Sequence, residues 1–283
     1  MAEIVNLEQF IEHVLKPKPV TGVTRFYRGV GEHHEVVPSV MLNPGHKENE
    51  NKLFDELLAK NPGDFNNDTY TIDKLVRMQH HSLPTRLLDI TFNPLIALYF
   101  ACERKSRPDG EVIVFEVRSS DIKFPDSDTV SCLANIARLN QKNRDEICGF
   151  LRSENLNQPS TKDKFNETVA AKKLLHLIKQ EKPYFLPQIR PKDLSRIVVV
   201  RGKSSNARIS AQAGAFLFFG LEVNFAESPK GERAVLERIS ILASSKSKIL
   251  RELDTLNVNE STVYPALDRS AHYIKQKYFT RQN

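Results

Sequence analysis

Hydrophobic residues recur at helical spacing in several parts of the chain. Residues 7–15 place five apolar side chains on one face, directly after Asn6, which is a favourable helix N-cap. Asn93-Pro94 combines a cap residue with proline at the first helical position, and the segment after it is apolar nearly all round, so a buried helix is expected there. The other segments with helical periodicity are 48–60, 72–81, 246–256 and 266–278.

Short runs rich in apolar, β-branched and aromatic residues predict β-strands between these helices. The runs are 24–30, 87–91, 111–117, 197–200, 215–219 and 235–242. Helices dominate the first half of the chain and strands alternate with loops later, so the predicted fold class is α+β, with a mixed or antiparallel central sheet flanked by helices. Residues 126–185 are more polar, with helix-like stretches near 131–143 and 163–181. They are predicted to form a helical insertion within a single domain that spans residues 1–283.

Composition narrows the function only slightly. The chain has 283 residues and a net charge of +6, which weakly favours anionic partners such as nucleotides or nucleic acid, although a solvated surface is the favoured explanation of the charge. Cys102, Cys132 and Cys148 have no spacing typical of a disulfide framework or zinc knuckle, and this pattern fits a reducing compartment. No signal peptide or membrane span is predicted, so a cytoplasmic location is expected.

The densest group of reactive side chains lies in residues 79–91, which contain two imidazoles, a guanidinium, a carboxylate and two threonine hydroxyls. His80 can act as an acid, a base or a polar anchor because imidazole titrates near neutral pH; capping a helix end is the alternative. Arg86 and Asp89 are three residues apart and could pair with each other; a structural role is favoured for them, since breaking a buried pair costs about 3–5 kcal/mol. No metal site is predicted, because the histidines lack i, i+4 spacing.

A series of short motifs follows in a distinctive order along nearly the whole chain. The motifs are Tyr27-Arg28-Gly29, Pro38-Ser39, Gln79-His80, Leu83-Pro84-Thr85-Arg86-Leu87-Leu88-Asp89, Ala97-Leu98-Tyr99-Phe100-Ala101, Arg208-Ile209-Ser210-Ala211-Gln212-Ala213-Gly214-Ala215-Phe216, Lys248-Ile249 and Tyr264-Pro265-Ala266-Leu267-Asp268. This order resembles the FRG domain, which is named after its Phe-Arg-Gly motif and occurs in bacterial and phage-related proteins, including defence-type gene sets. Three residues depart from the family pattern: Tyr27 replaces phenylalanine, Ser82 stands where glycine is common, and Ile90 where tryptophan is common.

The motif order is also similar to that of ADP-ribosyltransferases. This second resemblance implies an ADP-ribosyltransferase-like fold, NAD as the substrate and no metal. It places Arg28, Thr91 and Gln212 on three strands of one cleft, with His80 beside them. The reaction would cleave the bond between nicotinamide and ribose and pass ADP-ribose to a macromolecule or to water.

Each residue of this cleft also has a structural alternative. Arg28 can grip a pyrophosphate and Gly29 can let the backbone approach it; a structural ion pair is the alternative for Arg28. Gln212 can bond a ribose hydroxyl but cannot carry the negative charge that best stabilises an oxocarbenium-like transition state. The resemblance to the FRG domain, in which a glutamate follows the Pro-Ser motif, implies that Glu50 supplies this carboxylate, with Asp89 as the alternative. The predicted cofactor-binding residues are Arg28, Gly29, Thr85, Arg86, Asp89 and Thr91, and the predicted catalytic residues are His80, Glu50 and Gln212.

Further basic residues leave a second class of function open. Residues 201–208 form a basic loop that lacks the Walker A spacing, so a solvated turn is favoured over a phosphate site. Lys275, Lys277 and Arg281 would extend it to a nucleic-acid surface if they lay on the same side. The alternative to an enzyme, such as a toxin or defence transferase, is therefore a non-catalytic module that recognises a nucleotide, a nucleic acid or a protein in an anti-phage system.

Overall fold

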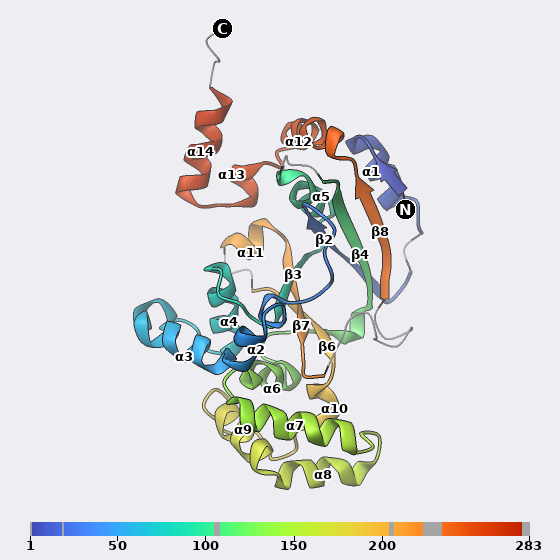
Figure 1. The fold of residues 1–283 in the computed structure, drawn as a ribbon. Coiled ribbons are helices and arrows are strands. Elements are labelled where there is room, and N and C mark those ends of the chain that lie inside the picture. The colour runs from blue at the N-terminus through green and yellow to red at the C-terminus, as the bar shows by residue number, and fades with distance from the viewer. Residues whose placement is uncertain (1, 19, 105–107, 204–206, 223–233, 279–283) are drawn as a thin grey trace.

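The computed structural model describes residues 2–18, 20–104, 108–203, 207–222 and 234–278, and its centre is an eight-stranded sheet (Figure 1). The strands are β1 (Ala2–Ile4), β2 (Val23–Val30), β3 (Leu87–Thr91), β4 (Gly110–Arg118), β5 (Ile122–Lys123), β6 (Ile197–Arg201), β7 (Gly214–Phe219) and β8 (Ala234–Ile241). Their order in the sheet is β1-β8-β4-β2-β3-β7-β6-β5. The two outermost pairs are parallel and the inner pairs antiparallel, so the predicted α+β class with a mixed sheet is confirmed.

The sheet consists of two halves that meet at β2 and β3. Their described register contains one pair, Tyr27 opposite Thr91, whereas β2 pairs with β4 and β3 pairs with β7 over their whole lengths. Because β2 and β3 pair at this one described position, side chains can reach the backbone of both strands on either side of it. The two arginine- and aspartate-bearing motifs of the sequence, in β2 and β3, therefore lie side by side at this junction.

Helices surround the sheet. They are α1 (Leu7–Leu15), α2 (Pro44–Glu48), α3 (Glu50–Lys60), α4 (Thr71–His80), α5 (Pro94–Glu103), α6 (Asp128–Ile136), α7 (Gln141–Ser153), α8 (Pro159–Glu167), α9 (Val169–Lys179), α10 (Pro191–Leu194), α11 (Ala207–Ala211), α12 (Lys246–Thr255), α13 (Glu260–Val263) and α14 (Leu267–Lys277), with short 3-10 turns such as η1 (Ser39–Met41). The predicted helices outside the insertion are confirmed to within two residues, and the caps Asn6 and Asn93 accept the expected backbone bonds from Gln9 and Leu95. No helix of the described residues is long and apolar enough to cross a bilayer.

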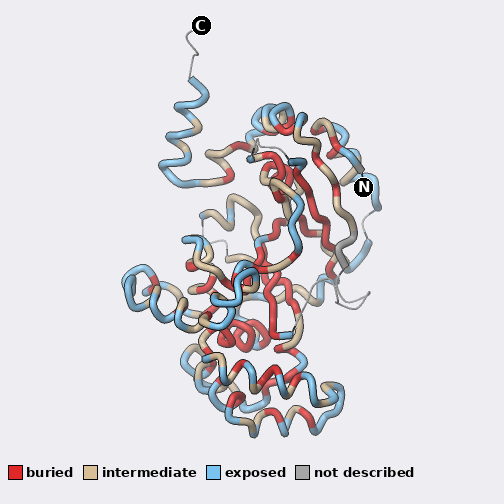
Figure 2. Tube along the Cα trace, in the orientation of Figure 1, coloured by how far each residue is buried: buried red, intermediate tan, exposed pale blue. Residues whose placement is uncertain are grey.

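Buried side chains form three clusters, and each cluster packs particular helices or faces of the sheet together. Helices α1, α5 and α12 pack on the half-sheet that contains β4, through residues such as Phe10, Val112 and Ile249. Helices α4, α6, α7 and α9 pack on the other half, against Val198 and Phe218. A third cluster joins the remaining faces of the two halves. Figure 2 shows this burial concentrated in the strands and the helices beside them, whereas α14 is exposed along its length.

The segment predicted as an insertion folds into four helices, α6 to α9, rather than the two helix-like stretches expected (Figure 1). Asn140 and Thr168 cap α7 and α9 with their side chains, and Pro159 begins α8, so local start signals divide the segment. These signals outweigh the weak hydrophobic periodicity of a polar stretch. The division into one domain with an insertion at 126–185 stays a prediction.

Candidate functional site

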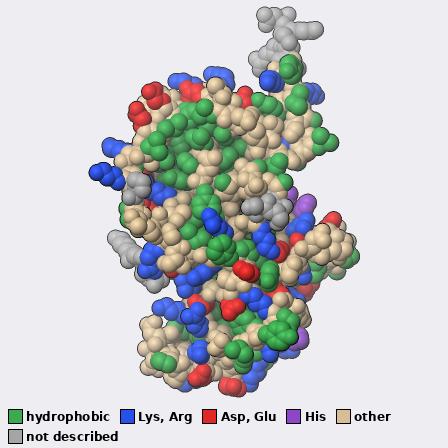
Figure 3. All heavy atoms as spheres, turned by 180° about the vertical axis from the view of Figure 1, so that it is seen from behind, with side chains coloured by type: hydrophobic (Ala, Val, Ile, Leu, Met, Phe, Trp, Pro, Cys, Tyr) green, Lys and Arg blue, Asp and Glu red, His purple; other side chains and the backbone are tan. Residues whose placement is uncertain are grey.

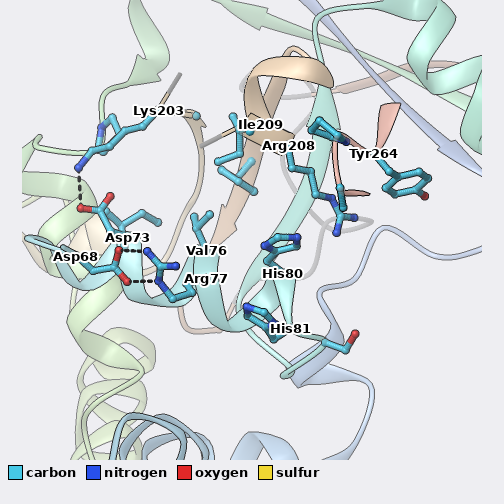
Figure 4. A pocket seen from close by; sticks show the side chains of 18 of the residues that line it. Asp68, Asp73, Val76, Arg77, His80, His81, Lys203, Arg208, Ile209 and Tyr264 are labelled. Carbon is cyan, nitrogen blue, oxygen red and sulfur yellow. Dashed lines mark hydrogen bonds and ion pairs between the residues drawn. The ribbon is translucent and has the colours of Figure 1, made fainter. Parts of the chain in front are cut away.

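A pocket with a volume of about 1160 Å³ lies among α4, the end of β6, α11 and residues 264–269 (Figure 4). Six lysine or arginine side chains line it, against three aspartates. The cations are Arg77, Arg104, Arg201, Lys203, Arg208 and Arg269. The lining therefore carries a positive balance that attracts anions.

Two ion pairs lie on the side of the pocket formed by α4. The Nε and Nη2 atoms of Arg77 donate to the two carboxylate oxygens of Asp68 at 2.7 and 2.8 Å. Lys203 Nζ donates to Asp73 Oδ2 at 2.6 Å, and Figure 4 shows both pairs on one wall. Because each of these cations has a carboxylate partner, the two pairs add little to the net charge of the pocket.

The opposite wall is organised around Tyr264. The guanidinium carbons of Arg208 and Arg269 lie 5.3 and 5.1 Å from the centroid of its ring, within the range of cation–π attraction. The Tyr264 hydroxyl donates to Glu103 at 3.0 Å, which fixes the ring. Arg208 is consequently held in a defined position, on the same side of the pocket as His80 (Figure 4).

His80 is the last residue of α4 and lies at the pocket mouth, exposed to solvent. Partial desolvation of the ring lowers the pKa of His80 below its ordinary value of 6.5, and the neighbouring charges of Arg208, His81 and Arg77 lower it further; Asp89 acts in the opposite direction. The imidazole is thus mostly neutral at pH 7, so that one ring nitrogen can accept a proton and the other can donate a hydrogen bond. This position agrees with a polar anchor or acid–base group, a role that stays a prediction.

The turn after α4 shows why glycine is common at position 82 in the family pattern. Ser82 has a φ of 65°, in the left-handed region where glycine is favoured, and the backbone N–H of Leu83 bonds the carbonyl of Met78 at 3.0 Å. This is a Schellman-type helix end. Glycine at position 82 would adopt the same turn with less strain, and the serine belongs to the pocket lining.

The motif residues of β2, η1, α4 and β3 form one hydrogen-bonded network, here called the motif cluster: Arg28, Ser39, Gln79, Thr85 and Asp89. Gln79 accepts from Thr85 Oγ1 at 2.5 Å and donates to Asp89 Oδ1 at 2.8 Å. Arg28 Nη1 crosses the junction of the half-sheets to the Asp89 carbonyl at 2.7 Å, and burial lowers the pKa of Arg28. Ser39 Oγ accepts from the Thr85 backbone at 3.2 Å. The resemblance thus identified residues that meet in space.

Arg86 lies beneath this cluster and pairs with Glu50, not with Asp89. Its Nε and Nη2 atoms both donate to Glu50 Oε2, at 2.9 and 2.6 Å, and both residues are at most 3 % exposed. The possible pairing of Arg86 with Asp89 is therefore not found, and the structural role favoured for Arg86 agrees with its burial. Among the described lining of the pocket Glu50 is absent, so the carboxylate predicted for catalysis is held inside the protein.

Gly29 meets the helix α5 rather than an open cleft. A Cβ atom at this position would lie 1.7 Å from the carbonyl oxygen of Ala97 and 2.8 Å from the backbone nitrogen of Ala101. The close approach that glycine allows is therefore between β2 and α5. The role of Gly29 beside a cofactor stays a prediction.

Thr91 and Gln212 bond each other and the chain around them. Thr91 Oγ1 donates to the Gln212 carbonyl at 2.6 Å and accepts from the Asn93 backbone at 2.9 Å. Gln212 Nε2 donates to the Val263 carbonyl at 3.1 Å. Of the four side chains expected to line one cleft, His80 lines the described pocket, whereas Arg28, Thr91 and Gln212 do not. The convergence of all four side chains on one cleft therefore stays a prediction.

For the other residues that line the pocket, the sequence contains little or no indication of a binding role. Arg201 and Lys203 belong to the basic loop for which a solvated turn is favoured, and they line the pocket; Ser204, Ser205 and Asn206 lie outside the described residues, as does Arg281. Arg208 and Tyr264 open two of the quoted motifs without an assigned role. Single cations such as Arg77 and Arg269 on polar helices are indistinguishable from solvated residues before folding. No described group of His, Cys, Asp and Glu side chains is arranged to hold a metal.

No curated protein and no solved structure matches the chain. A family model, described as the FRG domain, matches residues 24–110. This stretch runs from β2 to the first residue of β4 and contains the whole motif cluster together with Glu50, Arg86 and His80. The pocket wall that carries Arg208 and Tyr264 lies beyond it. The chain therefore contains an FRG domain, with its motif residues gathered at the junction of the two half-sheets.

Proposed function

We propose that this chain binds a phosphate-bearing nucleotide, with NAD and ADP-ribose among the candidates, in the pocket between α4 and α11. The observation that supports it is the pocket lining: cations from separate segments surround one cavity of about 1160 Å³ beside a neutral imidazole. Pockets for small ligands typically hold about 300–1000 Å³, so a dinucleotide has room here. Guanidinium groups match the bidentate geometry of phosphate oxygens.

Arg208 is the residue on which this proposal depends most. Removing a charged hydrogen-bond donor typically costs about 1.5–3 kcal/mol, so Arg208→Ala is expected to weaken ADP-ribose binding roughly 10- to 100-fold in titration calorimetry. Arg152→Ala provides the matched control, because this arginine is 66 % exposed on α7, pairs with Glu222 and does not line the pocket. Equal affinities of the Arg208→Ala variant and the wild type would contradict the proposed site.

When the nucleotide binds, His80 is also expected to take up a proton. An anion beside the ring raises the pKa of His80 from its lowered value in the free protein, so the complex holds more protons than the free protein at pH values between the two pKa values, and affinity rises as the pH falls through that interval. Calorimetry of ADP-ribose in two buffers with different ionisation enthalpies measures this uptake. His80→Gln should abolish it, whereas His176→Gln on α9 should not. Undiminished uptake by His80→Gln would assign the proton to another group.

Cleavage of NAD beside His80 is the second candidate. One observation favours it: Asp89, which does not itself line the pocket, is an exposed carboxylate oriented by Gln79, and its charge acts on the pKa of His80. Such a carboxylate can stabilise an oxocarbenium-like transition state. The ADP-ribosyltransferase-like fold, the defence or toxin context and a nucleic-acid or protein target belong to this proposal as well.

Binding without turnover is preferred, because Glu50 and Gln212 use their side chains in contacts with the protein. The two candidates separate when the pure protein is incubated with NAD and free nicotinamide is followed. Release that disappears in Asp89→Asn and Arg28→Ala favours the enzyme. Tight binding of NAD or ADP-ribose without release favours the recognition module.

A further inference from the structure

A stack of rings and one cation runs from the core to the surface beside the pocket. The rings of Phe26 and Phe92 have centroids 4.5 Å apart. The guanidinium of Arg201 lies 5.4 Å from the Phe92 ring and 6.0 Å from the Phe124 ring. Phe26 is fully buried, whereas Phe124 is 57 % exposed. The stack therefore begins in the hydrophobic core and ends at a ring in solvent.

The exposed end of this stack lies at the rim of the basic pocket. Arg201 lines the pocket, and so does Pro125, the residue after Phe124. Figure 3, which shows the molecule from behind, shows lysine and arginine side chains, with aspartates and glutamates between them, around the middle of this face. An aromatic ring held by a cation beside a phosphate-attracting cavity has the two components with which proteins bind nucleotides, a stacking surface and a cationic groove.

We propose that Phe124 is the stacking platform for the base of the nucleotide whose phosphates lie in the pocket. This inference rests on the proposed function and adds the chemical class of ligand: a phosphate joined to a planar nucleobase, rather than a phosphate or sugar phosphate alone. Arg201 covers one face of the Phe124 ring and restricts its orientation, so little ordering is needed when a base contacts the ring. Without a base stacked on it, the apolar ring of Phe124 exposes surface to water, which is unfavourable.

The test compares ligands with and without a base on the full-length protein. Calorimetry with ADP and with pyrophosphate is carried out for the wild type, Phe124→Ala and Phe124→Tyr. The Phe124→Ala variant loses one stacking contact, so it is expected to bind ADP about 5- to 100-fold more weakly than the wild type. Its affinity for pyrophosphate should stay within about twofold of the wild type. Phe124→Tyr, which keeps the ring, should bind both ligands as the wild type does. Tyr184→Ala, at a residue 95 % exposed that does not line this pocket, is the matched aromatic control.

The outcomes separate this inference from the proposed function. Wild-type binding of pyrophosphate and ADP with equal affinity, or ADP binding undiminished in Phe124→Ala, overturns the platform but leaves the phosphate pocket standing. Binding of neither ligand overturns both. A 5′-phosphorylated single-stranded RNA hexamer distinguishes the source of the base. Tighter binding of the hexamer than of ADP, with the same loss in Phe124→Ala, supports the platform and assigns it to a strand end; binding of ADP alone supports it for a free nucleotide.

Discussion

Replacing Glu50 with alanine is expected to lower the free energy of unfolding by about 3–5 kcal/mol, as for other buried ion pairs that lose one partner. Arg86 is 1 % exposed, and two of its nitrogens donate to the same Glu50 oxygen at 2.9 and 2.6 Å. Its third contact, from Nη1 to the carbonyl of Gly220 at 3.2 Å, does not carry a compensating charge. The variant would therefore bury an unpaired guanidinium. Urea denaturation followed by circular dichroism measures the loss.

Two further variants make this result specific. Glu222→Ala removes the partner of Arg152 in a pair whose side chains are 66 % and 31 % exposed, and is expected to cost at most about 1 kcal/mol. Glu50→Gln keeps the shape and one acceptor and should fall between the two. A Glu50→Ala protein as stable as the wild type, with ligand binding or turnover lost, would instead restore the functional role that the family resemblance implies.

Among alanine substitutions at the described glycines, Gly29→Ala is expected to be the most damaging. The added Cβ would lie 1.7 Å from the Ala97 oxygen and 2.7 Å from its carbonyl carbon, and these are backbone atoms of a buried helix that cannot rotate away. Ordinary overpacking of a core costs about 1–3 kcal/mol; here β2 and α5 must separate, so the loss should exceed that range. The measurement is again the free energy of unfolding, with the yield of folded protein as a second readout.

Gly149→Ala is the matched control for this substitution. Gly149 lies inside α7, and no neighbouring atom lies within 4 Å of the place that a Cβ would occupy, so alanine should stabilise the helix by up to about 1 kcal/mol. Wild-type stability of Gly29→Ala would show that β2 and α5 are farther apart than described. It would then reopen a role for Gly29 beside a ligand.

The sequence predicted local structure well because its signals act over a few residues. Asn6 and Asn93 cap helices at the expected positions, and the strand 87–91 has the bounds expected from its residues. The insertion was less well predicted, since its helices are short and polar and begin at caps such as Asn140 rather than at a strong hydrophobic period. The motif resemblance went further, because residues that share an order along the chain proved to share one hydrogen-bonded cluster.

Partners and pockets depend on contacts between residues far apart in the chain, and only the tertiary structure decided them. By itself the sequence determined which segments are helices and strands, and that reactive side chains concentrate in residues 79–91. It could not determine that Arg86 turns inward to Glu50, 36 residues away. Nor could it determine that a side chain at position 29 would collide with the backbone of α5. Nor could it place Tyr264 and His80 in one pocket. Local propensity acts through neighbours along the chain, whereas charge pairing and cavity shape depend on which strands become adjacent in the sheet.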